Sequence, residues 1–334
     1  MVLAILSVVG VWSALATTVC KADGAASDAD RKVASIVPAW VFPINPPSSS
    51  AIQTYDHMKA IHTPGSPVTY TEADLNDLFA APDWFPASHS AMPSVVAIGR
   101  PPEVYACGYC HTPTGQGRPE NASLAGLPAS YIVQQLADFS SGARRSAWPD
   151  SYRPADRMIH AAKFVTAEET AVAAEYFSQQ HLKSHVRVAE RLRVPRSEVV
   201  GWVYAAEPGG GDELLGQRLL EFTPDAARHE NRDDGLQYIA YVPIGSLKRG
   251  RSIARSGEGG LAYACVSCHG DRLQGVGLIP RIAGRSPTYL LRQLLAFKSG
   301  ARSGTTGQPM LPVISHLGVK DMIAVAAYAA SLEP

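Results

Sequence analysis

The sequence predicts an all-α protein built from two similar helical modules, joined by a loop-rich segment with a few short β-strands. Two observations carry this prediction. One pattern of residues occurs twice, starting at position 107 and again at position 265, with apolar residues at helical spacing. The 28 glycines and 25 prolines indicate many turns between short elements rather than a bundle of long helices.

Length and composition place the chain among globular proteins. Its 334 residues are enough for two or three domains, and an apolar share of 46% against a charged share of 18% excludes a disordered chain. Thirty basic residues balance thirty acidic residues, so the net charge gives no electrostatic reason to expect a nucleic-acid partner.

The amino-terminal segment is typical of an exported protein. Residues 2–19 carry no charge, and the run Ala14-Leu15-Ala16 offers a cleavage site with small residues at 14 and 16, so we expect residues 1–20 to be a signal peptide and the chain to be periplasmic. No basic residue precedes the apolar run, so an uncleaved anchor stays an alternative, as does lipid attachment at Cys20. The chain would then be membrane-bound only through that segment or that lipid.

The other four cysteines fall in two C-x-x-C-H motifs. These are Cys107, Cys110 and His111, and then Cys265, Cys268 and His269. On one helical turn, two thiols at this spacing reach the two vinyl groups of a porphyrin, and the next residue offers an imidazole to its iron. A redox dithiol or half a zinc site is the alternative for a bare C-x-x-C, but a histidine follows both times. The sequence predicts two covalently bound haem c groups, each holding iron.

The repeat continues for about thirty residues beyond each motif. Its matched positions are Gly126 and Gly284, Tyr131 and Tyr289, Gln135 and Gln293, Phe139 and Phe297, and Ser-Gly-Ala-Arg at 141–144 and 299–302. The spacing predicts an amphipathic helix in each module that ends at a glycine and can lay one face on a haem.

A methionine precedes the last predicted helix of each module. Met158 and Met310 each lie 18 residues before a tyrosine, and alanine-rich helices are predicted over 166–180 and 318–332. A loop in front of each helix could place the thioether over the open face of the iron, whereas core filler is the ordinary role of a methionine.

The two methionine segments differ in ways that keep rival ligands open. Met310 is followed by Leu-Pro, while Met158 has no such proline, and module one has six more residues between its histidine and its methionine. His160 is the rival ligand in module one, and His316 is a weaker rival in module two.

Together these motifs resemble the class I cytochromes c, and the pair of modules is similar to the tandem diheme members of that family. The resemblance covers module one (residues 96–180) and module two (residues 247–334), somewhat over half the chain. It implies a small all-α fold around each haem and axial ligation by His111 and Met158 in module one and by His269 and Met310 in module two.

The resemblance also implies contacts around each haem. A proline carbonyl often holds the proximal histidine, and Pro280 fits that role, whereas Ala122 stands at the matched position and leaves this bond open in module one. Tyr131 and Tyr289 are expected to line the pockets. Arg144 and Arg302 fit carboxylate pairing with haem propionates as well as they fit a solvent-exposed helix end.

Two segments lie outside the repeat. The N-terminal extension (residues 33–95) is predicted to be loop-rich, with one short helix capped by Thr71 and Asp74, and to pack on module one. Its histidines (His57, His62 and His89) have no metal-ligand spacing. The connecting segment (residues 181–246) is predicted to hold two or three short strands, at 185–194, 218–222 and 237–242, and a turn at 208–212.

Module two is predicted to begin with a helix from position 245. Its basic run is Lys248, Arg249, Arg251 and Arg255. A solvated helix face is the favoured reading of this run, and a docking patch is the alternative.

The resemblance implies a periplasmic diheme cytochrome that is an electron-transfer protein rather than an enzyme. It would relay single electrons between a dehydrogenase, or another donor, and a downstream cytochrome or oxidase, with no small-molecule substrate. A role as the electron-transfer subunit of a dehydrogenase complex fits the same features. The alternative is a diheme cytochrome c peroxidase with module one as the peroxidatic haem, which the longer loop and His160 keep open. A haem-bearing structural or assembly module is the third class.

Overall fold

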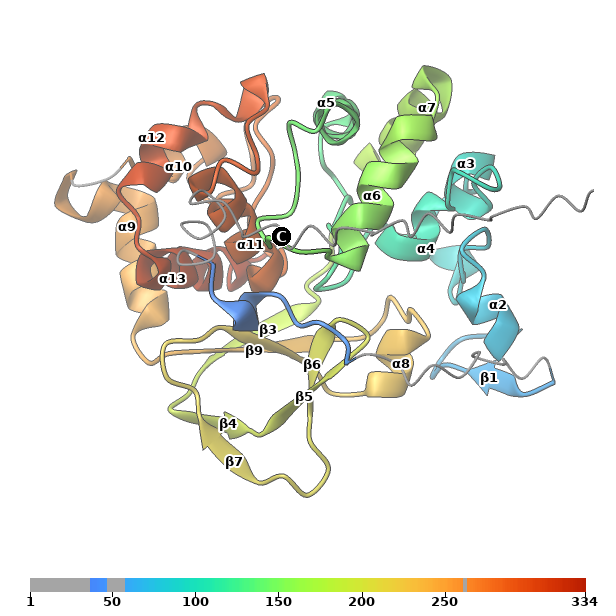
Figure 1. The fold of residues 1–334 in the computed structure, drawn as a ribbon, viewed down its shortest axis with the longest axis horizontal. Helices are drawn as coiled ribbons and strands as arrows, with labels where there is room; N and C mark the ends of the chain where they lie inside the picture. The colour runs from blue at the N-terminus through green and yellow to red at the C-terminus, as the bar shows by residue number, and fades with distance from the viewer. Residues whose placement is uncertain (1–36, 47–57, 261–262) are drawn as a thin grey trace, which may run out of the picture.

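A computed structural model describes residues 37–46, 58–260 and 263–334. The expected signal peptide, Cys20 and His57 lie outside the described residues. Helices and strands are both present, with 39% of the described residues helical and 15% in strands, so the fold is not purely all-α. Figure 1 shows the helices of the two modules side by side above the strands of the connecting segment. No helix in the described part of the chain has both the length and the apolar character that a membrane span requires.

Module one consists of short helices. They are α3 (Ser94–Ala97), α4 (Cys107–His111), α5 (Ala129–Ser141), α6 (Arg153–Phe164) and α7 (Ala167–Ser178). Of these, α4, α5 and α7 match predicted helices, whereas α3 and α6 were not predicted. α5 ends at Gly142, whose φ of 79° is the left-handed conformation that glycine adopts at a helix end. α7 begins with a capping box in which Thr166 and Glu169 satisfy each other's backbone N–H groups.

Module two repeats this arrangement and adds a longer first helix. Its helices are α9 (Ser246–Gly260), α10 (Val266–His269), α11 (Pro287–Lys298), η3 (Thr305–Gly307), α12 (Met310–Ser315) and α13 (Val319–Ala330). α9 starts where the sequence predicted a helix and packs closely on α13. A Cβ at Gly250 would lie only 2.0 Å from the carbonyl oxygen of Ala324, so the approach of these two helices requires glycine there.

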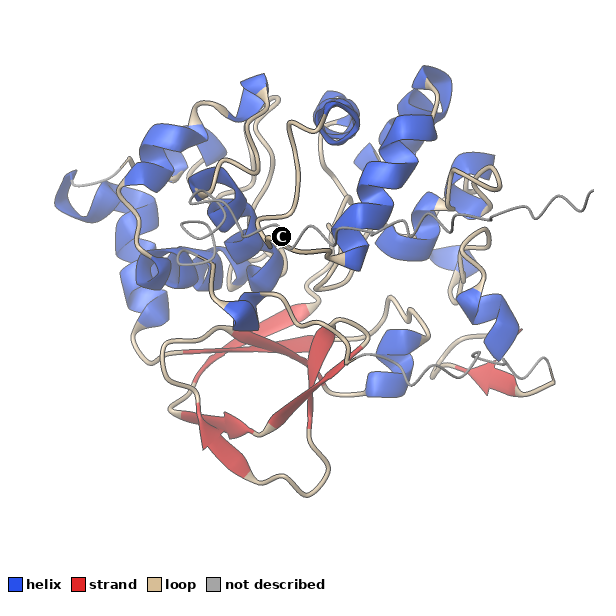
Figure 2. Cartoon of the chain, in the orientation of Figure 1, coloured by secondary structure: helices blue, strands red, loops and turns tan. Residues whose placement is uncertain are grey.

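The connecting segment forms a β-subdomain rather than a loop with isolated strands (Figure 2). Its strands are β3 (Val186–Glu190), β4 (Arg193–Pro195), β5 (Ser197–Val200), β6 (Val203–Ala206), β7 (Asp212–Leu214), β8 (Leu220–Thr223) and β9 (Tyr238–Val242). Five of them make a mixed sheet in the order β3-β9-β8-β6-β5, and β4 pairs with β7. The predicted strands correspond to β3 with β4, β8 and β9, and the predicted turn falls between β6 and β7.

The N-terminal extension contacts both modules. Its elements are η1 (Ala39–Val41), β1 (Ala60–His62), β2 (Thr69–Thr71), α2 (Glu72–Asn76) and η2 (Pro86–Ser88). The capping box at the start of α2 is present, since the Thr71 side chain accepts from Asp74 N while Asp74 accepts from Thr71 N. Residues after α2 reach module one, where Ala106 N donates to Leu78 O at 3.0 Å.

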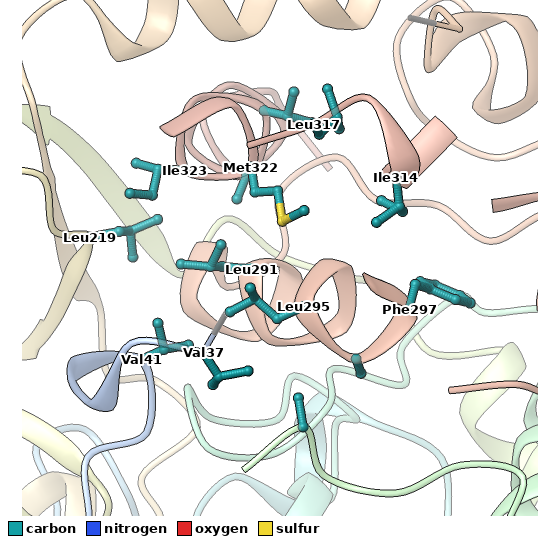
Figure 3. Close-up of a cluster of buried hydrophobic side chains, with 14 of the residues drawn as sticks. Val37, Val41, Leu219, Leu291, Leu295, Phe297, Ile314, Leu317, Met322 and Ile323 are labelled. Carbon is teal, nitrogen blue, oxygen red and sulfur yellow. The ribbon is translucent and has the colours of Figure 1, made fainter. Parts of the chain in front are cut away.

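The first part of the extension packs on module two instead. Val37 and Val41 are buried against Leu291 and Leu295 of α11, and Leu219 of the β-subdomain joins the same cluster (Figure 3). Such a contact leaves no local pattern in the sequence, because the residues that meet are some 250 positions apart. The extension therefore ties module two to the rest of the chain.

A buried histidine of the β-subdomain forms a hydrogen bond with module one through its backbone carbonyl. His229 lies in α8 (Ala226–Glu230), and its Nε2–H donates to Gly201 O at 2.8 Å while Nδ1 accepts from the Tyr238 hydroxyl at 2.9 Å. The His229 carbonyl accepts from Arg118 of module one at 3.0 Å. Burial lowers the pKa of His229 to about 4.

We expect this histidine to make the protein less stable in acid. Below a pH of about 6.5 the unfolded chain protonates His229 while the folded chain does not, so stability falls as pH drops from there towards 4. The loss amounts to about 3 kcal/mol by pH 4, at 1.36 kcal/mol per unit. Urea unfolding of the holoprotein across this pH range measures it. The slope should flatten in His229→Gln but stay in His62→Gln, and equal slopes in the two variants would contradict the assignment.

Candidate cofactor site

One cavity of about 640 Å³ lies between the two modules and is lined by matched residues from both. Its lining includes both C-x-x-C-H motifs through Cys107, Cys110, His111, Cys265, Cys268 and His269, together with Met158 and Met310. None of the four motif cysteines is in a disulfide. The fold thus brings the two predicted binding sites into one continuous space, which the sequence left undecided.

Each motif histidine is held by a backbone carbonyl eleven residues further along the chain. His111 Nδ1–H donates to Ala122 O at 2.8 Å, and His269 Nδ1–H donates to Pro280 O at 2.9 Å. Burial lowers the pKa of both imidazoles, which favours the neutral form that binds a metal. The bond left open in module one is therefore present, because a carbonyl accepts whether or not its residue is proline.

The two methionines line the cavity from helices, and neither lies in the loop that was predicted. Met158 lies inside α6, between Arg153 and Phe164, and Met310 is the first residue of α12. The six extra residues of module one lie before Met158. Met158 itself is on α6, which has a proline in its first turn, and this helix places Met158 in the cavity wall. The prediction of a swinging loop before the last helix is corrected in both modules.

The rival histidines lie elsewhere. The His160 ring stacks on Tyr105 with a centroid distance of 5.5 Å and also contacts the Phe164 ring at 5.0 Å. Neither His160 nor His316 belongs to the residues that line the cavity. On a helix, side chains two positions apart point in different directions, which is why Met158 and His160 diverge.

Arg144 and Arg302 are buried between the modules, with exposed fractions of 5% and 8%, so the exposed helix end is excluded. Each arginine bonds to the other module. Arg144 donates to the Tyr289 hydroxyl and to Gln293 Oε1, both at 2.8 Å. Arg302 donates to the Tyr131 hydroxyl and to Gln135 Oε1, both at 2.8 Å.

The cavity wall is electropositive. Arg144, Arg302 and Arg285 all line it, and no carboxylate among the described residues lies within ion-pair distance of any of them. Buried guanidinium groups without a carboxylate partner favour an anionic ligand. The sequence analysis missed Arg285, because its matched residue in module one is Leu127 and the repeat gave no signal for it.

These features fit two haem groups. The cavity offers two thiols, one imidazole and one thioether from each module, which are the donors that c-type haem uses. The unpaired positive charge suits carboxylate groups at the edge of a porphyrin. Tyr131 and Tyr289 also line the cavity, with their hydroxyls bonded to the arginines of the opposite module.

Comparisons with known proteins find relatives that are named as cytochromes c or as electron acceptors. No family model matches the chain. It is 28% identical over 207 residues to a thiosulfate dehydrogenase electron acceptor of Thiomonas intermedia, a match that covers 61% of this chain and 68% of the relative. It is 39% identical over 70 residues to cytochrome c-554(548) of Halomonas halodenitrificans, covering 21% of this chain and 84% of the relative. A solved thiosulfate dehydrogenase (TsdBA) from Marichromatium purpuratum aligns with a TM-score of 0.47 and 26% identity over 71% of this chain, but only 38% of the solved chain is covered.

Proposed function

The chain belongs to the diheme class I cytochromes c, and from this premise we propose that it relays single electrons in the periplasm between a dehydrogenase and a downstream cytochrome or oxidase. It binds two covalently attached haem c groups and takes part in electron transfer. The donor, the acceptor and the compartment are parts of the proposal.

The proposal assigns the cavity residues to the two haems as follows. Thioether bonds form at Cys107 and Cys110 in module one and at Cys265 and Cys268 in module two. The iron ligands would be His111 with Met158 in module one and His269 with Met310 in module two. When bound, each haem iron accepts and releases one electron, and histidine–methionine ligation gives it a relatively high potential. Arg144 and Arg302 supply positive charge for the haem propionates.

The matched donor sets are the observation that supports a carrier most strongly. A methionine from each module lines the same cavity as the motif histidine of that module. An iron held by both a histidine and a methionine would suit outer-sphere electron transfer, whereas peroxide chemistry needs a free coordination position. His160, the residue that favoured a peroxidatic module one, is not among the residues that line the cavity and stacks on Tyr105, which is.

The names of two relatives suggest which class of dehydrogenase is the electron donor. Both relatives, one of which is from Thiomonas intermedia, bear the name thiosulfate dehydrogenase electron acceptor. We therefore take a thiosulfate-oxidising dehydrogenase as the class of donor to test first.

A spectroelectrochemical redox titration of the holoprotein tests the proposal. We expect two one-electron waves, both well positive of the range for haems with two histidine ligands. One high wave with one strongly negative wave would contradict ligation by Met158 and would make module one a candidate peroxidatic site. A peroxide turnover assay on the reduced protein then separates the two functions, and a carrier is expected to show no turnover above free haem.

A further inference from the structure

The loop that follows the motif histidine has the same backbone in both modules. It covers residues 112–120 in module one and residues 270–278 in module two. Gly117 N donates to His111 O at 2.9 Å, and the matched Gly275 N donates to His269 O at 2.8 Å. Any difference in exposure between the two loops therefore comes from what packs against them.

In module one this loop is covered by the β-subdomain. All nine residues are buried. The Thr114 hydroxyl donates to Asp234 at 2.6 Å, and Gln116 Nε2 donates to His181 O at 2.8 Å. The neighbouring helix α4 is covered as well, because the Arg232 guanidinium lies 3.8 Å from the centre of the Tyr109 ring. The residue of module two that matches Tyr109 is Ser267, which has no aromatic ring for an arginine to cover.

In module two the matched loop is open. Val276 and Leu278 have exposed fractions of 56% and 71%, and Tyr263 in front of the motif has 61%. Val276 and Leu278 are matched in module one by Arg118 and Glu120, which are both buried and form an ion pair with each other at 2.7 Å. An apolar surface at the mouth of the cavity in module two thus replaces a sealed ion pair in module one.

Basic side chains surround this open surface. Arg255 and Arg272 are exposed, and Arg255 Nη1 donates to Asp271 O at 3.2 Å, so the last turns of α9 lie beside the loop. Arg281, at the other end of the loop, lines the cavity. Asp271 is the acidic residue of the loop itself. An apolar centre with a basic rim is complementary to a surface that carries carboxylates around an apolar centre.

We propose that, of the two modules, only module two docks redox partners, and that the partner is a redox protein with an acidic docking face. The inference rests on the proposed function and adds where electrons enter and leave. In each encounter one electron passes between the partner's cofactor and the haem of module two, one being oxidised as the other is reduced, with no transfer of atoms. Module one exchanges electrons through module two, across the shared cavity.

Hexacyanochromate(III), a redox-inert paramagnetic trianion, maps the docking face on the reduced holoprotein. We expect amide NMR signals of residues 270–281 to broaden on titration, while those of residues 112–123 stay sharp. Broadening of both loops to the same extent, or of neither loop, would overturn the inference. This readout does not depend on electron transfer.

Oxidation of the fully reduced holoprotein by hexacyanoferrate(III) tests kinetically whether electrons leave through module two alone. Each oxidant takes one electron and becomes hexacyanoferrate(II). The double variant Arg255→Glu with Arg272→Glu should slow the whole absorbance change about tenfold at low salt, since charge steering changes association rates by this order. Two Arg→Glu changes on the exposed face of the β-subdomain, at Arg187 and Arg193, alter the net charge equally and should leave the rate nearly unchanged.

The outcomes separate the inference from the function on which it rests. If only half the absorbance change slows, module one exchanges electrons with the oxidant directly and the inference is overturned. If the control variant slows as much as the test variant, the basic rim has no local role and the acidic partner is excluded. If the wild-type protein fails to exchange electrons at both haems, the proposed carrier function fails and the inference fails with it.

Discussion

Replacing Met310 with histidine is expected to lower the potential of the second haem by an amount on the order of 0.3 V, within the span of about 0.8 V that axial ligands control. The reason is that an imidazole stabilises the oxidised iron more than a thioether does. Met310 lines the cavity from the first turn of α12, so an imidazole at this position starts from the same part of the cavity wall. The measurement is a redox titration in which one wave moves and the other stays.

Met158→His should move the other wave by a similar amount, which assigns each wave to a module. His160→Gln serves as the matched control, because this ring packs on Tyr105 rather than along the cavity. Met92→Leu is a second control, since Met92 packs in the core of module one outside the cavity lining. A wave that moves in His160→Gln and not in Met158→His would show that the histidine is the ligand.

Replacing Arg144 with methionine is expected to lower the free energy of unfolding by about 3 kcal/mol and to weaken the contact between the modules. The substitution leaves the Tyr289 hydroxyl without the Arg144 guanidinium, and it removes the shorter of the two donors to Gln293 Oε1, whose other donor is Arg302 at 3.3 Å. A buried acceptor that loses its partner costs about 1–3 kcal/mol, and a buried charge that loses its counterpart costs more. Denaturant unfolding of the holoprotein measures the loss.

Arg302→Met should have a similar effect, since its bonds to Tyr131 and Gln135 mirror those of Arg144. Arg187→Met removes an exposed guanidinium from the β-subdomain and should change stability by less than about 0.5 kcal/mol. A loss confined to the module that carries the substitution, seen as two separate unfolding transitions, would contradict the crossed pairing.

The repeat allowed much of the fold to be predicted, because a helix is specified by residues three and four positions apart. The helices around Tyr131 and Tyr289, and the capping box at Thr71, follow from such local patterns. The β-subdomain was under-predicted because its strands are three to five residues long and its parallel pairs join distant segments, as when β3 meets β9. A pattern within a short window of the sequence cannot indicate that β3 pairs with β9.

The site was predictable in its donors and not in its connections. The C-x-x-C-H motifs and the late methionines are local signals, and all of them line the cavity. The partners of Arg144 were hidden by the repeat itself, because both modules carry the same tyrosine and glutamine. A sequence with two equal candidates cannot tell which copy an arginine meets. Arg285 was missed for the opposite reason, since it breaks the repeat.

The crossed arginines have a consequence for how such a chain arises. Arg144 and Arg302 occupy the same position in the two modules, and their backbones form an antiparallel bridge with each other. Equivalent residues that meet each other lie on a local two-fold axis, as they do at the isologous interface of a symmetric dimer. The two modules are therefore joined as a fused homodimer is, and a gene duplication within a self-associating single-haem ancestor would yield this interface without inventing a new contact.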